Sequence, residues 1–293
     1  MSAFLAVVLS GLAATGLAAC QQGVDADGGG NDTAKLAAND DGGGGNSASI
    51  SASASASSDG SRSASSSAVS SPGGVAISKA TDLYSFAYSY PGEAVSVPAL
   101  AKDLDGDARL REQELAADTR TAAADAKANG YPYRPYETAI EWKTVADLPR
   151  FLSLSEQIYV FTGGAHGNTG YEASIWDKTT SQDLVPDDFF TSSAALEQAV
   201  RQQFCTRLDA ERSKRREGAP ASPDEYNQCV PVSETTVLLG SSNGQTFNRI
   251  GFIAAPYVAG PYAEGSYDIT VPVNQAILSA VKPEYRKYFS VMR

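Results

Sequence analysis

Histidine is almost missing from this chain of 293 residues, since His166 is the only one. A zinc site built from several histidines is therefore excluded, and any metal site must use His166 with carboxylates or thiols. Basic residues are also scarce, because 23 Lys and Arg stand against 34 Asp and Glu, a net charge of −11. Nucleic-acid binding needs clustered Lys and Arg, so this balance disfavours it. The chain also lacks a Cys-x-x-Cys motif, which disfavours a thioredoxin-like redox role.

The first 20 residues have the pattern of a secretory signal peptide. An apolar run from Phe4 to Leu17 is followed by small residues and Cys20. The sequence Leu-Ala-Ala-Cys resembles a lipobox, which predicts removal of residues 1–20 and lipidation of Cys20; an ordinary cysteine is the alternative. Gln21 is typical of Gram-negative lipoproteins released to the outer membrane. Residues 1–3 lack the usual positive charge, which leaves open whether Met1 is the true start.

Residues 21–74 are composed almost entirely of Gly, Ser, Ala, Asn and Asp, and they hold 11 of the 26 glycines. Such a segment has too little apolar surface to offset the entropy of ordering it, so we expect a disordered tether. Its root-mean-square span would be about 40 Å. Six Asp against two basic residues give it a charge of −4.

From residue 75 onward the pattern predicts an α+β fold with antiparallel sheet, helices packed on it and two small subdomains, 75–145 and 146–293. Aromatic alternation predicts a strand over 83–90, and a Pro98 start with an Asn-Gly end predicts a long amphipathic helix over 98–129. A second helix is expected over 192–217, its basic C-terminus solvated. The further strands are expected at 140–145, 150–161, 171–176, 237–239, 250–254 and 267–273, with a short helix near 274–281.

Two cysteines remain beyond Cys20. An even pair in an exported chain predicts a disulfide between Cys205 and Cys229. A pair of buried reduced thiols is the alternative interpretation.

Two motifs of specific order and spacing lie far apart in the chain. Residues 163–167 read Gly-Gly-Ala-His-Gly, and residues 256–265 read Pro-Tyr-Val-Ala-Gly-Pro-Tyr-Ala-Glu-Gly. With Asn168, Trp-Asp-Lys at 176–178 and Asp-Asp-Phe-Phe at 187–190, they resemble the PdaC/RsiV-like envelope domain family over residues 83–278. The resemblance implies an exported or membrane-anchored protein of two α+β subdomains. It also implies a domain found beside cell-wall deacetylases and in an anti-sigma factor that senses lysozyme, without the deacetylase's separate catalytic domain.

His166 has three candidate roles. An imidazole among three glycines can hydrogen-bond backbone groups across a tight turn, which favours a structural role. Ligand binding is the second possibility. The third is catalysis in a peptidoglycan-directed hydrolase, with Asp177 or Glu172 as the carboxylate partner.

Residues 103–114 follow part of the spacing of a calcium loop. Asp103, Asp105 and Asp107 occupy positions 1, 3 and 5, and Glu114 occupies position 12. Position 6 is Ala108, where the turn requires Gly. The alternative is a charged face of the long helix, and the calcium interpretation predicts a calcium-dependent adhesion module.

Tyrosines gather in two segments that could bind a ligand, because each ring supplies apolar area and a hydroxyl. Packing between the subdomains is the alternative. Our hypothesis is a periplasmic protein, anchored through the Cys20 lipid to the outer membrane, whose non-catalytic domain binds a cell-wall glycan or an envelope protein without a cofactor. The candidate ligand-binding residues are Tyr131, Tyr133, Tyr136, His166, Asn168, Tyr257 and Tyr262.

Overall fold

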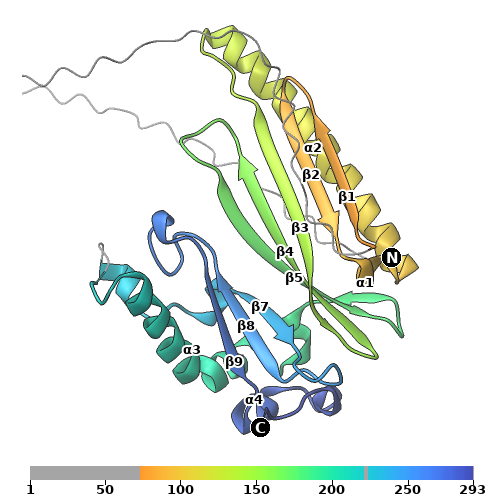
Figure 1. Cartoon of the computed structure of the whole chain (residues 1–293), viewed down its shortest axis with the longest axis vertical. Helices are drawn as coiled ribbons and strands as arrows, with labels where there is room; N and C mark the ends of the chain where they lie inside the picture. Colours follow the sequence, from red (N-terminus) through yellow and green to blue (C-terminus); the bar gives the residue numbers. More distant parts are fainter. Residues whose placement is uncertain (1–72, 221–223, 293) are drawn as a thin grey trace, which may run out of the picture. The chain divides into compact units, whose positions relative to one another are not determined.

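A computed structural model describes residues 73–220 and 224–292 (Figure 1). The predicted signal peptide, Cys20 and the tether up to residue 72 lie outside the described residues. Within the described ranges no helix is long and apolar enough to cross a bilayer. The fold is α+β, as predicted, with two sheets and a long helix on each.

The larger sheet has six strands in the order in which they occur along the chain. Neighbouring strands are antiparallel except β2 and β3, which run parallel because α2 crosses over between them. A bulge between Thr144 and Ala146 interrupts the pairing of β3 with β4. The strands are β1 (Val75–Ala80), β2 (Tyr84–Tyr90), β3 (Tyr136–Asp147), β4 (Phe151–Phe161), β5 (Asn168–Asp177) and β6 (Gln182–Leu184).

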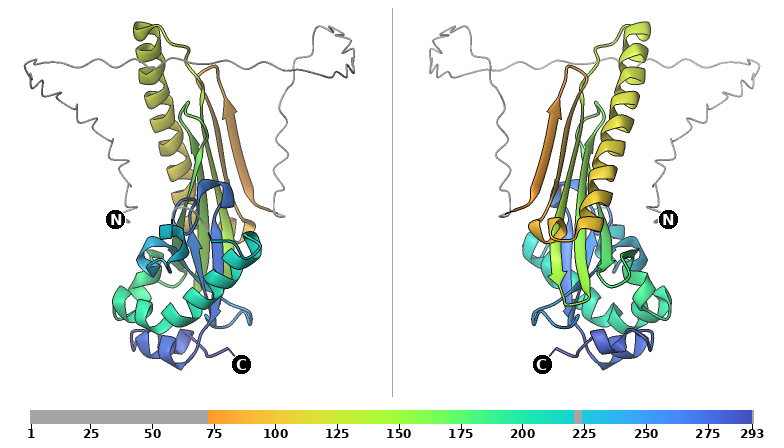
Figure 2. Two further views of the ribbon diagram at one scale, coloured as in Figure 1. Left: turned by 90° about the vertical axis from the view of Figure 1, so that its left-hand side faces the viewer. Right: turned by 90° about the vertical axis from the view of Figure 1, so that its right-hand side faces the viewer.

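Helix α2 (Pro98–Asn129) has the predicted bounds and covers one face of this sheet, preceded by the short α1 (Gly92–Val95). Figure 2 shows α2 running along the strands. Pro98 starts the helix where its missing N–H costs nothing, and Gly130 ends it with a left-handed φ of 73°. The strand predicted from alternating aromatic residues is confirmed as β2. Its aromatic side chains all point to one face and are buried, namely Tyr84, Phe86, Tyr88 and Tyr90.

The acidic residues of the predicted calcium loop lie in the middle of α2, so the loop conformation that calcium ligation needs is absent from residues 103–114. Asp105 accepts a hydrogen bond from the Tyr90 hydroxyl at 2.7 Å, and Asp107 accepts one from Tyr88 at 2.9 Å. The calcium interpretation is therefore wrong. Part of the acidic spacing reflects instead the pairing of a helix with tyrosines on a neighbouring strand.

The smaller sheet contains β7 (Thr236–Gly240), β8 (Arg249–Ala254) and β9 (Tyr267–Pro272), all antiparallel. Helix α3 (Ser193–Arg215) packs on it through Val200, Phe204 and Leu208, and α4 (Gln275–Ala280) packs beside α3. The predicted disulfide is confirmed, with Cys205 and Cys229 joined at a Cα–Cα distance of 5.4 Å. Short 3-10 helices complete the fold at Pro186–Phe189, Asp224–Asn227, Val232–Glu234, Tyr262–Glu264 and Arg286–Tyr288.

The two sheets contact each other through β3, β4 and β5 on one side and β7 on the other. Thr236 Oγ1 donates to the Tyr171 carbonyl at 2.8 Å, and the Tyr171 hydroxyl lies 2.9 Å from Ser266 Oγ. The subdomain boundary expected between residues 145 and 146 falls inside β3, so it is not where the sheets divide. The six-stranded sheet continues to Leu184, and the three-stranded sheet begins at Thr236.

Candidate functional site

The Gly-Gly-Ala-His-Gly motif forms the turn from β4 to β5. Gly163 adopts a left-handed φ of 85°, which a residue with a Cβ rarely does. Arg134 Nη1 donates to the carbonyls of Gly163 and Gly164 at 3.1 and 2.6 Å. The segment between α2 and β3 therefore holds this turn in place.

Gly167 is the point where the two sequence motifs meet. A Cβ there would overlap the Tyr159 ring, so only glycine allows that ring to lie against the backbone. The Tyr262 hydroxyl donates to the Gly167 carbonyl at 2.9 Å. This bond joins two residues that lie 95 positions apart, one from each motif.

His166, Tyr257 and Tyr262 form what we term the aromatic cluster. The His166 imidazole stacks on the Tyr262 ring with a centroid distance of 3.8 Å, and its Nε2 lies 3.3 Å from the Tyr257 hydroxyl. Its Nδ1 lies 2.8 Å from the Gly167 carbonyl, which fits the predicted structural role in the turn. The Tyr257 side chain is 49% exposed, and its backbone has a left-handed φ of 73°. Such strain persists only where the surroundings fix it, and it concentrates at functional sites.

Three arginines at the end of α3 fix the loop that carries these tyrosines. Arg212 Nε donates to the Ala259 carbonyl at 2.9 Å, and Arg215 donates to the carbonyls of Glu264 and Ser266. Arg216 binds both Glu264 carboxylate oxygens at 2.8 Å and lowers the pKa of that carboxyl.

The basic end of α3 was expected to be solvated, which holds for the exposed Lys214 and Arg215 but not for Arg212 one turn earlier. Arg212 is 3% exposed, because the loop of residues 255–266 folds over the end of the helix. Local sequence cannot show which distant loop covers a helix terminus. These arginines are therefore positioning residues that sequence reasoning missed.

Among the described residues, the other predicted ligand-binding residues make no ring contact or hydrogen bond with the aromatic cluster. The Tyr131 hydroxyl donates to Asp125, and the Tyr133 hydroxyl donates to the Leu83 carbonyl at 2.7 Å. Tyr136 stacks at an angle on Tyr133 with 5.8 Å between ring centroids and faces the turn at Gly163. Asn168 is exposed at the start of β5.

Neither carboxylate suggested as a partner for His166 contacts it. Asp177 lies at the other end of β5, bound to Arg150 at 2.6 Å. Burial would raise the pKa of Asp177, but the hydrogen bonds from Arg150 and Thr179 outweigh it and lower that pKa. Glu172 lies opposite Glu156 on β4, on the face that α2 covers. In the described part of the chain, the polar contacts of His166 are Gly167 and Tyr257.

Glu156 belongs to a buried polar group beneath α2. Its side chain is fully buried, and Arg111 Nη2 lies 3.3 Å from one carboxylate oxygen. Arg111 also pairs with Asp107 at 3.0 Å, so one cation serves two carboxylates. Burial raises the pKa of Glu156 to about 8, with Arg111 opposing the shift and Glu172 adding to it.

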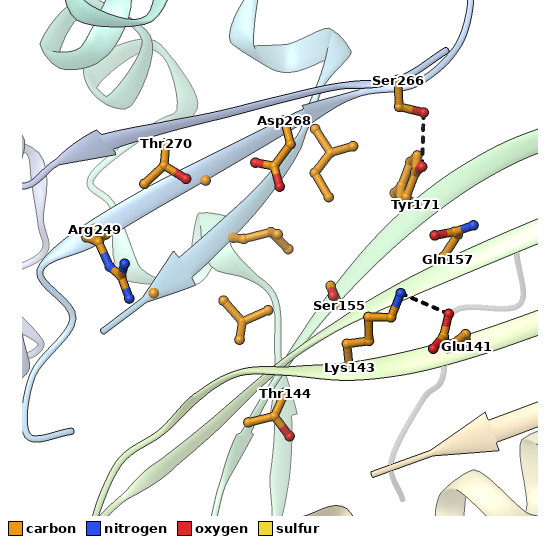
Figure 3. Close-up of a pocket in the computed structure, with 15 residues that line it drawn as sticks. Glu141, Lys143, Thr144, Ser155, Gln157, Tyr171, Arg249, Ser266, Asp268 and Thr270 are labelled. Atoms are coloured by element: carbon orange, nitrogen blue, oxygen red, sulfur yellow. Dashed lines mark hydrogen bonds and ion pairs between the residues drawn. The ribbon is translucent and has the colours of Figure 1, made fainter. Parts of the chain in front are cut away.

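A cleft of about 520 Å³ lies between the two sheets (Figure 3). One wall is the face of β3, β4 and β5 that points away from α2, and the other is the face of β7, β8 and β9 that points away from α3. The Tyr171–Ser266 hydrogen bond closes one end, and Ser266 follows directly after the loop of the aromatic cluster. Hydroxyl, amide and charged groups line it, among them Glu141, Lys143, Ser155, Gln157, Arg249, Asp268 and Thr270.

Metal ligation has little basis in the described ranges, because no three His, Cys, Asp or Glu side chains come together there in a way that could hold an ion. The site instead offers aromatic faces on loops and a polar cleft between sheets. Stacking and hydrogen bonding are what this arrangement can do.

Residues 77–169 match the family model described as deacetylase PdaC. The predicted resemblance to PdaC is therefore confirmed for these residues, which cover the larger sheet up to the start of β5. The chain is also similar to crystal structures of two members of the DUF3298 family. One, from Bacteroides fragilis NCTC 9343, has 15% identity and a TM-score of 0.48 over 73% of this chain and 95% of that chain. The other, from Pseudomonas aeruginosa PAO1, has 18% identity and a TM-score of 0.43 over 75% and 97%. No curated protein matches the chain.

Proposed function

We propose that this protein is anchored in the cell envelope through a lipid on Cys20 and that its folded domain binds a cell-wall glycan without catalysing a reaction on it. The aromatic cluster carries the proposal. Tyr257 and His166 are exposed beside the stacked Tyr262, and an aromatic face next to hydrogen-bonding groups suits the apolar face and hydroxyls of a sugar ring.

The anchoring part rests on the sequence alone. The apolar run, the small residues and Cys20 are typical of a lipoprotein signal, and Gln21 favours the outer membrane. The periplasm is the compartment in which such a lipoprotein meets the cell wall. The Cys205–Cys229 disulfide is consistent with an oxidising compartment.

Binding without catalysis is favoured by the surroundings of His166. A hydrolase needs a base held by a carboxylate or aimed at a nucleophile, whereas His166 is occupied by a carbonyl and a tyrosine hydroxyl. An envelope protein is the second candidate ligand, because exposed tyrosines also form protein interfaces.

The test is retention of the full chain on purified peptidoglycan sacculi. We expect the wild type to be retained and Tyr257→Ala to lose retention several-fold, while Tyr257→Phe keeps most of it because the ring stays. Tyr131→Ala is the matched control, since Tyr131 is 51% exposed and has no ring contact with the cluster.

Failure of the wild type to bind sacculi would overturn the glycan proposal. If an envelope extract then yields a protein partner whose binding requires Tyr257, the second candidate replaces it. Release of soluble wall fragments by the wild type and not by His166→Ala would contradict the absence of catalysis.

A further inference from the structure

Two opposite charges face the cleft from the smaller sheet. Arg249 on β8 and Asp268 on β9 lie on the face away from α3, because their neighbours Ile250 and Ile269 point into the core. Asp268 pairs with Ile253, four residues along β8 from Arg249. At about 3.3 Å per residue, the two charged positions are about 13 Å apart along the strands.

Both charged groups can accept a further partner. The Asp268 carboxylate has no hydrogen-bond or ion-pair partner among the described residues, and Figure 3 shows it pointing into the cleft. Arg249 uses Nη2 to donate to the Ser241 carbonyl, which leaves its other N–H groups for a ligand.

The strip between the two charges is centred on Gly251, with Leu238 on one side of it and Thr270 on the other. Gly251 lies between Arg249 and Ile253 on β8, and Gly240 lies opposite Arg249 on β7. A Cβ at Gly251 would come within 3.3 Å of Leu238. The facing wall carries Ser155 and Gln157, which can hydrogen-bond the amides of a chain lying along this strip.

We infer that this cleft binds a short extended peptide, with its free ammonium group at Asp268 and its free carboxylate at Arg249. Each extended residue spans about 3.3–3.6 Å, so the separation of the charges fits a peptide of about three to four residues. The cleft volume of about 520 Å³ lies within the range of ligand sites. An amino-sugar oligomer has an ammonium group for Asp268 but no carboxylate for Arg249. A loop within a protein chain has neither a free ammonium group nor a free carboxylate at its ends.

The proposal does not depend on the glycan site, which is formed by different residues. Isothermal titration of the full chain with tetra-alanine tests it, with N-acetylated and C-amidated tetra-alanine as blocked probes. The variants are Asp268→Asn and Arg249→Gln, and the matched controls are Asp118→Asn and Arg109→Gln, at exposed positions on α2. The unfolding midpoint of each variant checks that it folds.

We expect N-acetylation to weaken binding to the wild type about tenfold and to have no effect on Asp268→Asn, because the charge it pairs with is gone. Amidation should weaken binding to the wild type and have no effect on Arg249→Gln. Both control variants should behave as the wild type does, and Tyr257→Ala should bind tetra-alanine normally whatever it does on sacculi.

Several results would overturn the proposal. One is no binding of tetra-alanine to the wild type at millimolar concentration. Another is that blocking one end of the peptide weakens its binding to the wild type and to the corresponding variant equally. A third is that blocking an end leaves binding to the wild type unchanged, a result that can be obtained even if the variants do not fold. Binding of a glucosamine trimer that is lost in Asp268→Asn, with no peptide binding, would assign the cleft to amino sugars instead.

Discussion

The two long helices each cover a sheet, but the two interfaces are held together differently. Helix α3 meets the three-stranded sheet through apolar side chains, with Phe204 and Phe252 in contact at 5.2 Å between ring centroids. Helix α2 meets the six-stranded sheet through hydroxyl–carboxylate pairs as well, namely Tyr84–Glu112, Tyr88–Asp107 and Tyr90–Asp105. The position of α3 on its sheet depends on how well apolar side chains fill the space between them. The position of α2 depends in part on directional hydrogen bonds.

This difference shows why a buried carboxyl group can be retained. Apolar packing tolerates rotation of a helix over a sheet, whereas a series of hydrogen bonds fixes one register. The cost is that Glu156 is buried with one shared cation. Four substitutions test this comparison, in order of decreasing expected effect.

Phe204→Ala should cause the largest loss. Phe204 is fully buried in the apolar interface, and its truncation leaves a cavity that the rigid sheet cannot fill. We expect a loss of about 3–5 kcal/mol in the free energy of unfolding, measured with urea. A loss below about 1 kcal/mol would contradict the view that volume specifies this interface.

Tyr88→Phe should cost about 1–3 kcal/mol. The change removes the hydrogen bond to Asp107 and leaves the buried Trp142 Nε1 without its acceptor, the Tyr88 hydroxyl at 2.9 Å. Tyr90→Phe is the matched control, because it removes only the bond to Asp105. Equal losses in the two variants would show that the Trp142 bond contributes nothing.

Glu156→Gln should change how stability depends on pH. The pKa of Glu156 is raised to about 8 from an ordinary value near 4.5, so between these values the folded state keeps a proton that the unfolded state loses. The contribution of this group to stability therefore falls as pH rises through that window. Gln stays neutral, so the variant should be more stable than the wild type at pH 9 and similar at pH 4.

Urea unfolding at pH 4, 6.5 and 9 measures this, with the exposed Glu114→Gln on α2 as the control. The charged neighbours Arg111 and Asp107 on α2 and Glu172 on β5 remain in place in both variants. Parallel pH profiles for the wild type and Glu156→Gln would show that Glu156 is ionised in the folded protein at neutral pH.

Asp103→Asn should have the smallest effect, within about 0.5 kcal/mol, because Asp103 is not bonded to a tyrosine. Calcium should leave the melting temperature of the wild type and of this variant unchanged. A calcium-dependent rise that Asp103→Asn abolishes would contradict the helical role of residues 103–114.

Much of the fold follows from local sequence patterns. The bounds of α2 were predicted to the residue, because Pro98 and Gly130 mark both ends with backbone preferences that tertiary contacts do not override. Strand β1 was missed, since its side chains from Ala76 to Ala80 are exposed and show no alternation. Its position is fixed by pairing with β2, which a local pattern cannot reveal.

Only the part of the site that contains a recognisable sequence motif could be predicted. Glycines and a histidine in fixed order identified the turn at 163–167, and the family resemblance joined it to the second tyrosine loop. The cleft was not found, because its lining comes from six strands between Glu141 and Thr270. The packing of the two sheets decides which strand faces lie opposite each other. The alternation of apolar and polar residues within one strand does not show how the sheets pack.

Strand β1 also determines how a mechanical load would enter the fold. The chain enters the fold through β1, an edge strand whose backbone pairs with β2 alone, and Val75 pairs with Tyr90 at its end. A pull from the N-terminal side would act on that pair first and peel β1 away one pair at a time, as in unzipping. Because most β1 side chains are already exposed, detachment uncovers little apolar surface. The strand can therefore yield under force while the other strands of both sheets stay paired.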